Sequence, residues 1–341
     1  MRSTHPKDPT KHSAHCILRG TNMFTRQIHD IRQIVGAATP VEVEGFAPVQ
    51  HPLLPAINPV YQFRRDLLRP VIATWKQALH RHPHQPIQGL FLTGPSGSGK
   101  TSIVTQLFAR LNVPVFVFDA TRSTDLMEGV RTVGIEDGNT IDQPGGIVQA
   151  MIGGYPVLIN EVDVLKPEEG TLLYSILDSG QIATPDGQVV KAAPGFAMIF
   201  SANTNGTGDD TGLYAGTRRQ SAALTRRVRV VEVGYMDADQ EKRVLKAHFP
   251  DLDAALLDKV MRVLASTRNS ANNGSDGILR GLSTDETVSW INDALLSATM
   301  ERDGLNPFVE TLMWNYANKL QYDARDAVRK LAQGVFGGAA A

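Results

Sequence analysis

The residues with the clearest chemical potential form the run GPSGSGKT at positions 94–101. It fits the pattern of Gly, four residues, Gly, Lys and then Ser or Thr, in which a concave backbone gathers N–H groups around a polyphosphate. Lys100 can then reach the outer phosphates, and the Thr101 hydroxyl can ligate Mg²⁺. An apolar strand before the run and an amphipathic helix after it favour this interpretation over a glycine-rich turn without a ligand. The predicted nucleotide-binding residues are Gly94, Pro95, Ser96, Gly97, Ser98, Gly99, Lys100, Thr101 and Ser102.

A second chemical feature is the run PVLINEVDVL at positions 156–165, an apolar strand that ends in Asn160 and Glu161. In phosphate-loop enzymes such a strand end holds the metal and orients the attacking water. We predict that Glu161 polarises this water; the alternative is a surface acid at a strand end. Asn160 occupies the metal position, where its amide oxygen can accept a hydrogen bond but lacks the charge that strengthens one. We therefore expect weakened magnesium affinity and slow turnover, but not inactivity.

A third polar strand end occurs in IFSANTNGTG, which begins at residue 199. If this strand ends between the two just described, Asn203 can reach the outermost phosphate or the attacking water. Asparagine is also a common turn former, so the spacing alone leaves both interpretations open.

A cluster of arginines follows, without an acidic residue among them. Three interpretations stay open: a nucleic-acid patch, an arginine that stabilises the transferring phosphoryl group on a neighbouring subunit, or a solvated face. The five are Arg218, Arg219, Arg226, Arg227 and Arg229.

The elements that would position these residues alternate along the chain. Apolar runs at 88–94, 113–119, 156–160, 196–202 and 228–233 are separated by helical or glycine-rich stretches. This alternation predicts an α/β domain with a largely parallel five-stranded sheet. After Tyr235 the pattern becomes helical, with a break at 269–277 that is rich in Asn, Ser and Gly. We predict an N-terminal tail and extension at 1–49, partly disordered, an α/β core at 50–235 and an all-helical lid at 236–341.

Composition sets broad limits on function. The chain has 341 residues, 42% hydrophobic and 20% charged, and a formal net charge of −1. These values are ordinary for a globular protein and provide no overall attraction to nucleic acid or anionic membranes. One cysteine cannot form an internal disulfide, and no long apolar run suggests a membrane span. We expect a cytoplasmic protein.

The order of these motifs resembles the AAA+ ATPases. GPSGSGKT, LINEVD, FSANT and ALTRR, followed by a helical domain, are most similar to the MoxR branch. The run ANTNGTGDDTGLYAGTRRQSAALTRR is similar to the ATPase subunit of aerobic cobaltochelatase, CobS, and so are LSTDETVSWINDALL and ARDAVRKLAQGVFG near the C-terminus. The resemblance spans residues 50–337.

The resemblance implies an ATP- and Mg²⁺-dependent phosphate-loop enzyme in a hexameric ring that remodels a partner protein, often one with a von Willebrand A domain. It implies that Glu161 is the catalytic glutamate that polarises water, Asn203 the sensor of the outermost phosphate, and Arg226 the arginine donated to a neighbour's ATP. Thr101 and Asn160 would hold the metal. Segments 124–146 and 179–195 would form inserted hairpins, which glycine punctuation also favours. Alternatives are a nucleotide-gated scaffold with little hydrolysis, a subunit of a cobalt chelatase, or a nucleic-acid motor.

Three positions depart from the family pattern. Asn160 replaces an aspartate, and Thr225 replaces the acid before the finger arginine. Asp285 falls where the family has a lid arginine near the outermost phosphate; Arg280 is a nearby substitute.

Overall fold

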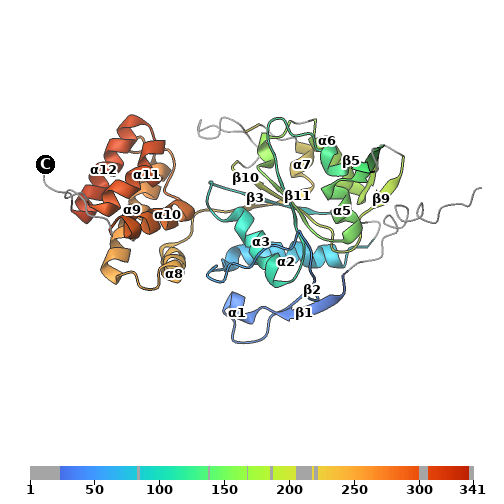
Figure 1. Ribbon diagram of the computed structural model, residues 1–341, viewed down its shortest axis with the longest axis horizontal. Coiled ribbons are helices and arrows are strands. Elements are labelled where there is room, and N and C mark those ends of the chain that lie inside the picture. Colours follow the sequence, from blue (N-terminus) through green and yellow to red (C-terminus); the bar gives the residue numbers. More distant parts are fainter. Residues whose placement is uncertain are drawn as a thin grey trace, which may run out of the picture.

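The computed structural model describes residues 24–82, 85–136, 139–166, 168–184, 187–204, 217–218, 222–298 and 306–337. These residues form an α/β body and a smaller helical body, joined by the segment that follows β11 (Figure 1). Each body has its own hydrophobic cluster, one drawn from residues between Phe24 and Val233 and the other from Leu245 to Phe336.

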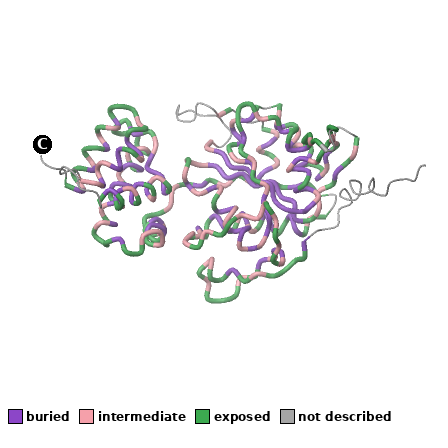
Figure 2. The backbone as a smooth tube through the Cα atoms, in the orientation of Figure 1, coloured by how far each residue is buried: buried purple, intermediate pink, exposed green. Residues whose placement is uncertain are grey.

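A five-stranded parallel sheet lies at the centre of the α/β body, as the sequence predicts. Its order is β11-β3-β10-β7-β4, with every neighbouring pair parallel. The three inner strands β3, β10 and β7 are apolar and almost entirely buried, which is typical of a sheet covered on both faces, whereas the edge strands β4 and β11 are partly exposed (Figure 2). Because all five run in one direction, their carboxyl ends share one edge. The strands are β3 (Gly89–Thr93), β4 (Phe116–Asp119), β7 (Val157–Asn160), β10 (Met198–Ala202) and β11 (Val228–Glu232).

Helices cover both faces of this sheet. Helices α2 (Arg65–Leu79) and α3 (Lys100–Arg110) lie on one side, and α6 (Gly170–Ser179) with α7 (Ala222–Thr225) lies on the other (Figure 1). Helix α5 (Gly146–Gly153) precedes β7 and contacts β4. The chain first moves across the sheet from β3 to the edge strand β4 and then returns through β7 and β10 to β11. Because each crossover is right-handed, the helices of the outward and return connections lie on opposite faces.

A short antiparallel hairpin precedes the α/β core. It consists of β1 (Arg26–Asp30) and β2 (Glu42–Phe46), with α1 (Arg32–Val35) between them. Trp75 of α2 holds the hairpin against the α/β core. Its indole nitrogen donates to the Glu44 carbonyl at 2.6 Å, and its ring packs edge-to-face against Phe46. The hairpin therefore shares the hydrophobic cluster of the sheet.

Both expected inserted hairpins are present. After α4 (Met127–Val130), β5 (Arg131–Glu136) pairs with β6 (Asn139–Pro144), and β8 (Gln181–Ala183) pairs with β9 (Val189–Lys191). The first hairpin exposes apolar side chains, with Val133 at 62% and Ile135 at 81%.

The helical body comprises α8 (Ala238–His248), α9 (Ala254–Asn273), α10 (Thr284–Ser297), α11 (Pro307–Asn315) and α12 (Tyr322–Phe336), with a 3-10 turn at Ala317–Lys319. The expected break at 269–277 is wrong in its first half. Helix α9 continues to Asn273 because a helix surface tolerates polar residues, and it ends at Gly274, which adopts the left-handed conformation. None of the described helices is long and apolar enough to cross a membrane.

The packing of Trp75 generates a stability prediction. Trp75 is 0% exposed, so Trp75→Ala should lower the free energy of unfolding by about 3–5 kcal/mol through a cavity and a lost hydrogen bond. Trp314, which is 47% exposed, provides the control, and Trp314→Ala should cost much less. Denaturant unfolding of both variants tests this; equal losses would contradict it.

Candidate functional site

The loop between β3 and α3 is shaped by glycines that other residues cannot replace. Gly94 and Gly97 have φ values of 147° and 73°. A Cβ on Gly94 would lie 2.2 Å from the Val233 carbonyl oxygen, and one on Gly97 would lie 2.5 Å from Cβ of Ser283. The loop is therefore pressed between the sheet and the helical body, and it leads into the N-terminal end of α3, where free N–H groups favour an anion.

Lys100 is held inside this loop. Its Nζ donates to the carbonyl oxygens of Gly94 at 2.8 Å and Pro95 at 2.9 Å, and to Asn203 Oδ1 at 3.3 Å. Burial lowers the pKa of the Lys100 ammonium to about 8, against the opposing influence of Asp163 and Glu161. Lys100 therefore carries its charge at neutral pH but close to its titration range.

Asn160 joins three neighbouring elements at the sheet edge. Its Oδ1 accepts the hydroxyl protons of Thr101 at 2.8 Å and Ser201 at 2.9 Å, and its Nδ2 donates to Asp119 Oδ1 at 2.8 Å. The carboxylate can only accept, which fixes the amide orientation. The Thr101 hydroxyl proton points to Asn160, so its oxygen lone pairs are available for a metal ion.

Glu161 follows Asn160 in a left-handed conformation, with φ of 53°. A non-glycine residue in this conformation costs about 1–2 kcal/mol and is often found at functional sites. The side chain is exposed, and no hydrogen bond joins its carboxylate to another described residue. Its carboxylate is thus free to bind a water molecule near the phosphate loop.

Asp163 holds the turn that follows β10 through hydrogen bonds. It is 0% exposed, and its Oδ2 accepts hydrogen bonds from the N–H groups of Asn203 and Thr204 at 3.1 and 3.0 Å and from the Thr204 hydroxyl at 2.9 Å. These bonds hold the turn after β10. Since β10 lies between β3 and β7, Asn203 is placed between the phosphate loop and the Glu161 turn.

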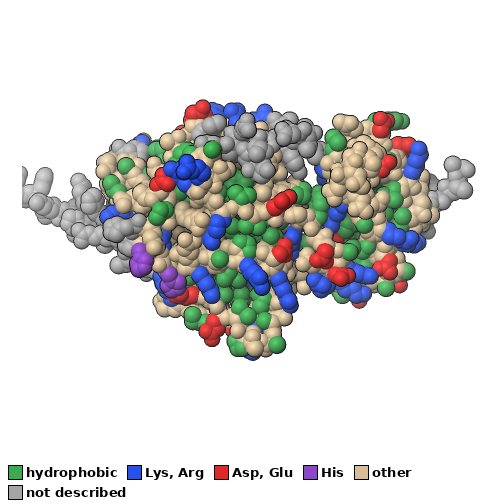
Figure 3. Space-filling model, turned by 180° about the vertical axis from the view of Figure 1, so that it is seen from behind, with side chains coloured by type: hydrophobic (Ala, Val, Ile, Leu, Met, Phe, Trp, Pro, Cys, Tyr) green, Lys and Arg blue, Asp and Glu red, His purple; other side chains and the backbone are tan. Residues whose placement is uncertain are grey.

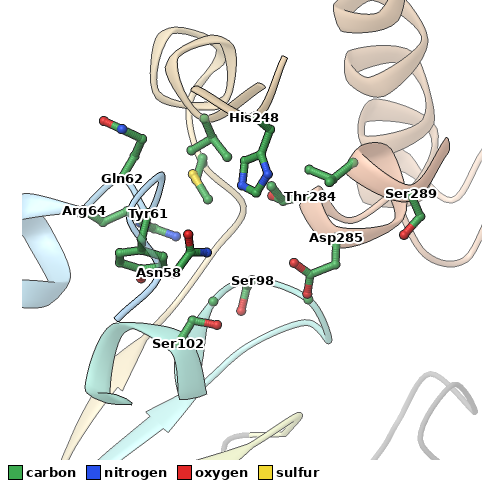
Figure 4. A pocket seen from close by; sticks show the side chains of 15 residues that line it. Asn58, Tyr61, Gln62, Arg64, Ser98, Ser102, His248, Thr284, Asp285 and Ser289 are labelled. Carbon is green, nitrogen blue, oxygen red and sulfur yellow. The ribbon is translucent and has the colours of Figure 1, made fainter. Parts of the chain in front are cut away.

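A cleft of about 310 Å³ opens beside the phosphate loop, between the two bodies. Residues from the segment before α2, from the loop and α3, from α8 and from α10 line it (Figure 4). Arg64 is part of the lining, and its guanidinium donates to the Gly234 carbonyl at 2.6 Å and to the Asp66 carboxylate at 2.7 Å. The lining includes Asn58, Tyr61, Arg64, Ser98, Ser102, Met236, Val244, His248, Thr284 and Asp285.

Asp285 points from the first turn of α10 toward the phosphate loop (Figure 4). Its pKa is raised by burial and by the neighbouring charge of Glu286, although His248 acts in the opposite direction. Arg280 does not take the place of a lid arginine in the cleft. Both of its terminal nitrogens donate to Glu286 at 2.8 Å, and its guanidinium lies over the Tyr316 ring.

The arginine cluster divides into residues with different surroundings. Arg227 binds Asp178 through two bonds of 2.6 Å, and Arg229 donates to Thr74 and Gln77. Arg226 is exposed, with no side-chain partner among the described residues. Arg219 lies outside the described residues. Basic and acidic side chains both occur on each body in Figure 3.

The donor set fits a nucleoside triphosphate with Mg²⁺. The loop offers backbone N–H groups and Lys100, Thr101 offers a metal ligand, and the buried Ser98 hydroxyl has no hydrogen-bond partner among the residues that the structure describes. Sequence reasoning missed Asp119, Ser201 and Arg64, and gave Asp163 no role. Asp119 carried a usable signal, because the predicted strand at 113–119 ends in it.

A parallel α/β sheet with a glycine-rich loop, a buried lysine and a hydroxyl linked to a second strand end defines the phosphate-loop class of nucleotide-binding proteins. The family model for the AAA domain of the dynein-related subfamily matches residues 89–237 of the chain. An uncharacterized protein of Staphylococcus haemolyticus is 31% identical over 196 residues, covering 55% of this chain and 71% of the relative. A Staphylococcus epidermidis protein matches equally, and a Staphylococcus aureus protein is 29% identical over the same length. The chain belongs to the AAA family.

The depressed pKa of Lys100 predicts pH-dependent ATP binding. The ammonium form is needed to bind phosphate, so affinity should be constant below about pH 7 and fall by up to about tenfold per unit above about pH 8. Lys100→Arg provides the control, since a guanidinium keeps its charge throughout this range. Titrations with a fluorescent ATP analogue test this, and the same slope in both proteins would contradict it.

Proposed function

We propose that this protein binds and hydrolyses ATP and uses the energy to remodel a partner protein. The observation that carries the proposal is the meeting of Lys100, Thr101, Glu161 and Asn203 at one edge of the sheet. In hydrolysis, the oxygen of a water molecule bonds to the γ-phosphorus while the bond to the ADP oxygen breaks. Glu161 would orient this water and accept its proton. Lys100 and the loop N–H groups would stabilise the charge on the phosphate oxygens.

The cleft beside the loop suits the nucleoside part of ATP. It is continuous with Gly97, Ser98 and Gly99, and it is bounded by both bodies. A ligand between the bodies makes contacts that change when either one moves, so binding and hydrolysis would be coupled to movement of the helical body. Mg²⁺ would be held by Thr101, whose hydroxyl Asn160 orients, and would neutralise charge on the outer phosphates.

We further propose a ring of identical subunits, six in number by analogy with the family, in which Arg226 reaches the ATP of a neighbour. Support comes from the different surroundings of the arginines: Arg227 and Arg229 are used within the chain, whereas Arg226 is exposed at the end of α7. The same observation weakens the alternative of a nucleic-acid motor, because these two guanidiniums contact their own chain.

The remodelling role is supported by the β5–β6 hairpin, whose exposed Val133 and Ile135 offer an apolar contact to another protein. The partner would be a protein complex, one with a von Willebrand A domain if the resemblance extends that far, or a metal chelatase in the cobaltochelatase case. A second candidate function is a nucleotide-gated scaffold that turns over little ATP. It is favoured by Asp285, which faces the loop where an arginine is expected.

Two substitutions separate binding from hydrolysis. Lys100→Ala should abolish ATP binding and turnover, because it removes the cation that contacts the phosphates. Glu161→Gln should keep ATP binding within about threefold but lower turnover by at least about a hundredfold, because the water loses its base. Phosphate release and equilibrium binding measure the two quantities. A partner complex is best captured with Glu161→Gln and ATP, because the nucleotide then stays intact.

The matched control is Glu168→Gln, an exposed acid seven residues after Glu161, which should behave as the wild type. Equal turnover in the wild type and both site variants would reject hydrolysis at this site. ATP binding and assembly without measurable wild-type turnover would favour the scaffold.

The role of Arg226 predicts complementation between subunits. Arg226→Ala should bind ATP normally but turn over about a thousandfold less, as is typical when a finger arginine is lost. Mixing it with Lys100→Ala should restore turnover, because an intact loop then meets an intact arginine across an interface. Arg243→Ala, at another exposed arginine, serves as the control. A mixture no more active than its components would contradict action between subunits.

A further inference from the structure

We propose that Asp119 supplies the negative charge of the magnesium site and so takes over the part of the metal-binding role that Asn160 lacks. Asp119 is the last residue of β4, and the strand register pairs it with Asn160 at the end of β7. The inference rests on the proposed function, because it assigns a residue to the metal ion that accompanies ATP.

The first argument is that the Asn160 oxygen has no acceptor capacity left. A carbonyl oxygen has two lone pairs. Asn160 Oδ1 already accepts the Thr101 hydroxyl at 2.8 Å and the Ser201 hydroxyl at 2.9 Å. Reversing the amide would turn its oxygen toward the Asp119 carboxylate, which cannot donate. Asn160 therefore positions Thr101 but cannot also accept a hydrogen bond from a metal-bound water.

The second argument is that Asp119 has the capacity that Asn160 lacks. An ionised carboxylate offers about four acceptor positions. Only one of them is used among the described residues, by Asn160 Nδ2 at 2.8 Å, and the side chain is exposed at the carboxyl edge of the sheet. Mg²⁺ keeps several of its waters and is commonly bound through a carboxylate together with substrate phosphates. Asp119 therefore matches the outer-sphere acceptor that the site requires.

The nearby acids on the other side of Asn160 are placed for other roles. Asp163 is buried, and its Oδ2 holds the turn at Asn203 and Thr204. Glu161 leaves β7 through its left-handed turn, away from the strand pairing that joins Asn160 to Asp119. A charge next to the amide N–H also polarises it, which makes Asn160 Oδ1 a stronger acceptor for the Thr101 hydroxyl.

The test measures metal dependence of binding, without relying on turnover. A fluorescent ATP analogue is titrated into the full chain in EDTA and then at increasing Mg²⁺, which gives the Mg²⁺ midpoint for tightened binding. Asp119→Asn keeps the shape of the side chain and its contact to Asn160. It should raise the midpoint about ten- to a hundredfold, the usual effect of losing an outer-shell partner, and leave affinity in EDTA unchanged.

The matched control is Glu232→Gln, which removes the same charge from the carboxyl end of β11, at the opposite side of the sheet. Its midpoint should equal that of the wild type. An unchanged midpoint in Asp119→Asn, or an equal increase in both variants, would overturn the inference. No binding of the analogue to the wild type, with or without Mg²⁺, would instead overturn the proposed function and this inference with it.

An exchange variant separates charge from structural support. Combining Asp119→Asn with Asn160→Asp keeps one carboxylate and one amide in contact but exchanges their strands. The Mg²⁺ midpoint of this double variant should return to within about threefold of the wild type. A midpoint that stays raised would overturn the assignment, because the carboxylate would then be present without effect. The double variant gives this answer even if Asp119→Asn alone proves unstable.

Discussion

The Asn160 amide is the interaction on which the geometry of the sheet edge depends. Three hydrogen bonds join it to Thr101 at the start of α3, Ser201 in β10 and Asp119 in β4. Each bond has a defined direction, because a carboxylate only accepts and an amide nitrogen only donates. An aspartate in this position could accept from the two hydroxyls but would repel Asp119. The amide is thus the residue type that is compatible with an acid on the neighbouring strand.

Asp163 plays a similar part on the opposite side of Glu161. Its buried carboxylate fixes the backbone of Asn203, whose side chain in turn accepts from Lys100 at 3.3 Å. Its charge also opposes the loss of the proton from Lys100, which burial favours. The loop lysine, the turn after β10 and the turn after β7 are therefore linked through one carboxylate. A displacement of any one of them would therefore alter the contacts of the other two.

Much of this arrangement follows from sequence pattern, and the rest depends on contacts between distant segments. The five strands and the phosphate loop were predictable, because apolar runs and glycine spacing are local signals. Which strand ends touch was not, since the contact of Asp119 with Asn160 depends on the order β10-β7-β4. The partners of Arg227 and Arg229 lie about 50 and 150 residues away in the chain. No local pattern distinguishes them from Arg226.

The helical body adds the last constraint on the loop. Ser283 caps α10 and lies against Gly97, so the positive N-terminal end of α10 approaches the phosphate loop. Asp285 in the same turn brings an opposing charge. Burial and Glu286 raise its pKa, so its negative charge is easier to remove than that of an ordinary exposed aspartate. When protonated, the same side chain becomes a hydrogen-bond donor to a phosphate or a ribose oxygen, and the repulsion becomes a contact. Under the proposed function, the approach of the helical body to a bound polyphosphate would therefore depend on the charge of Asp285.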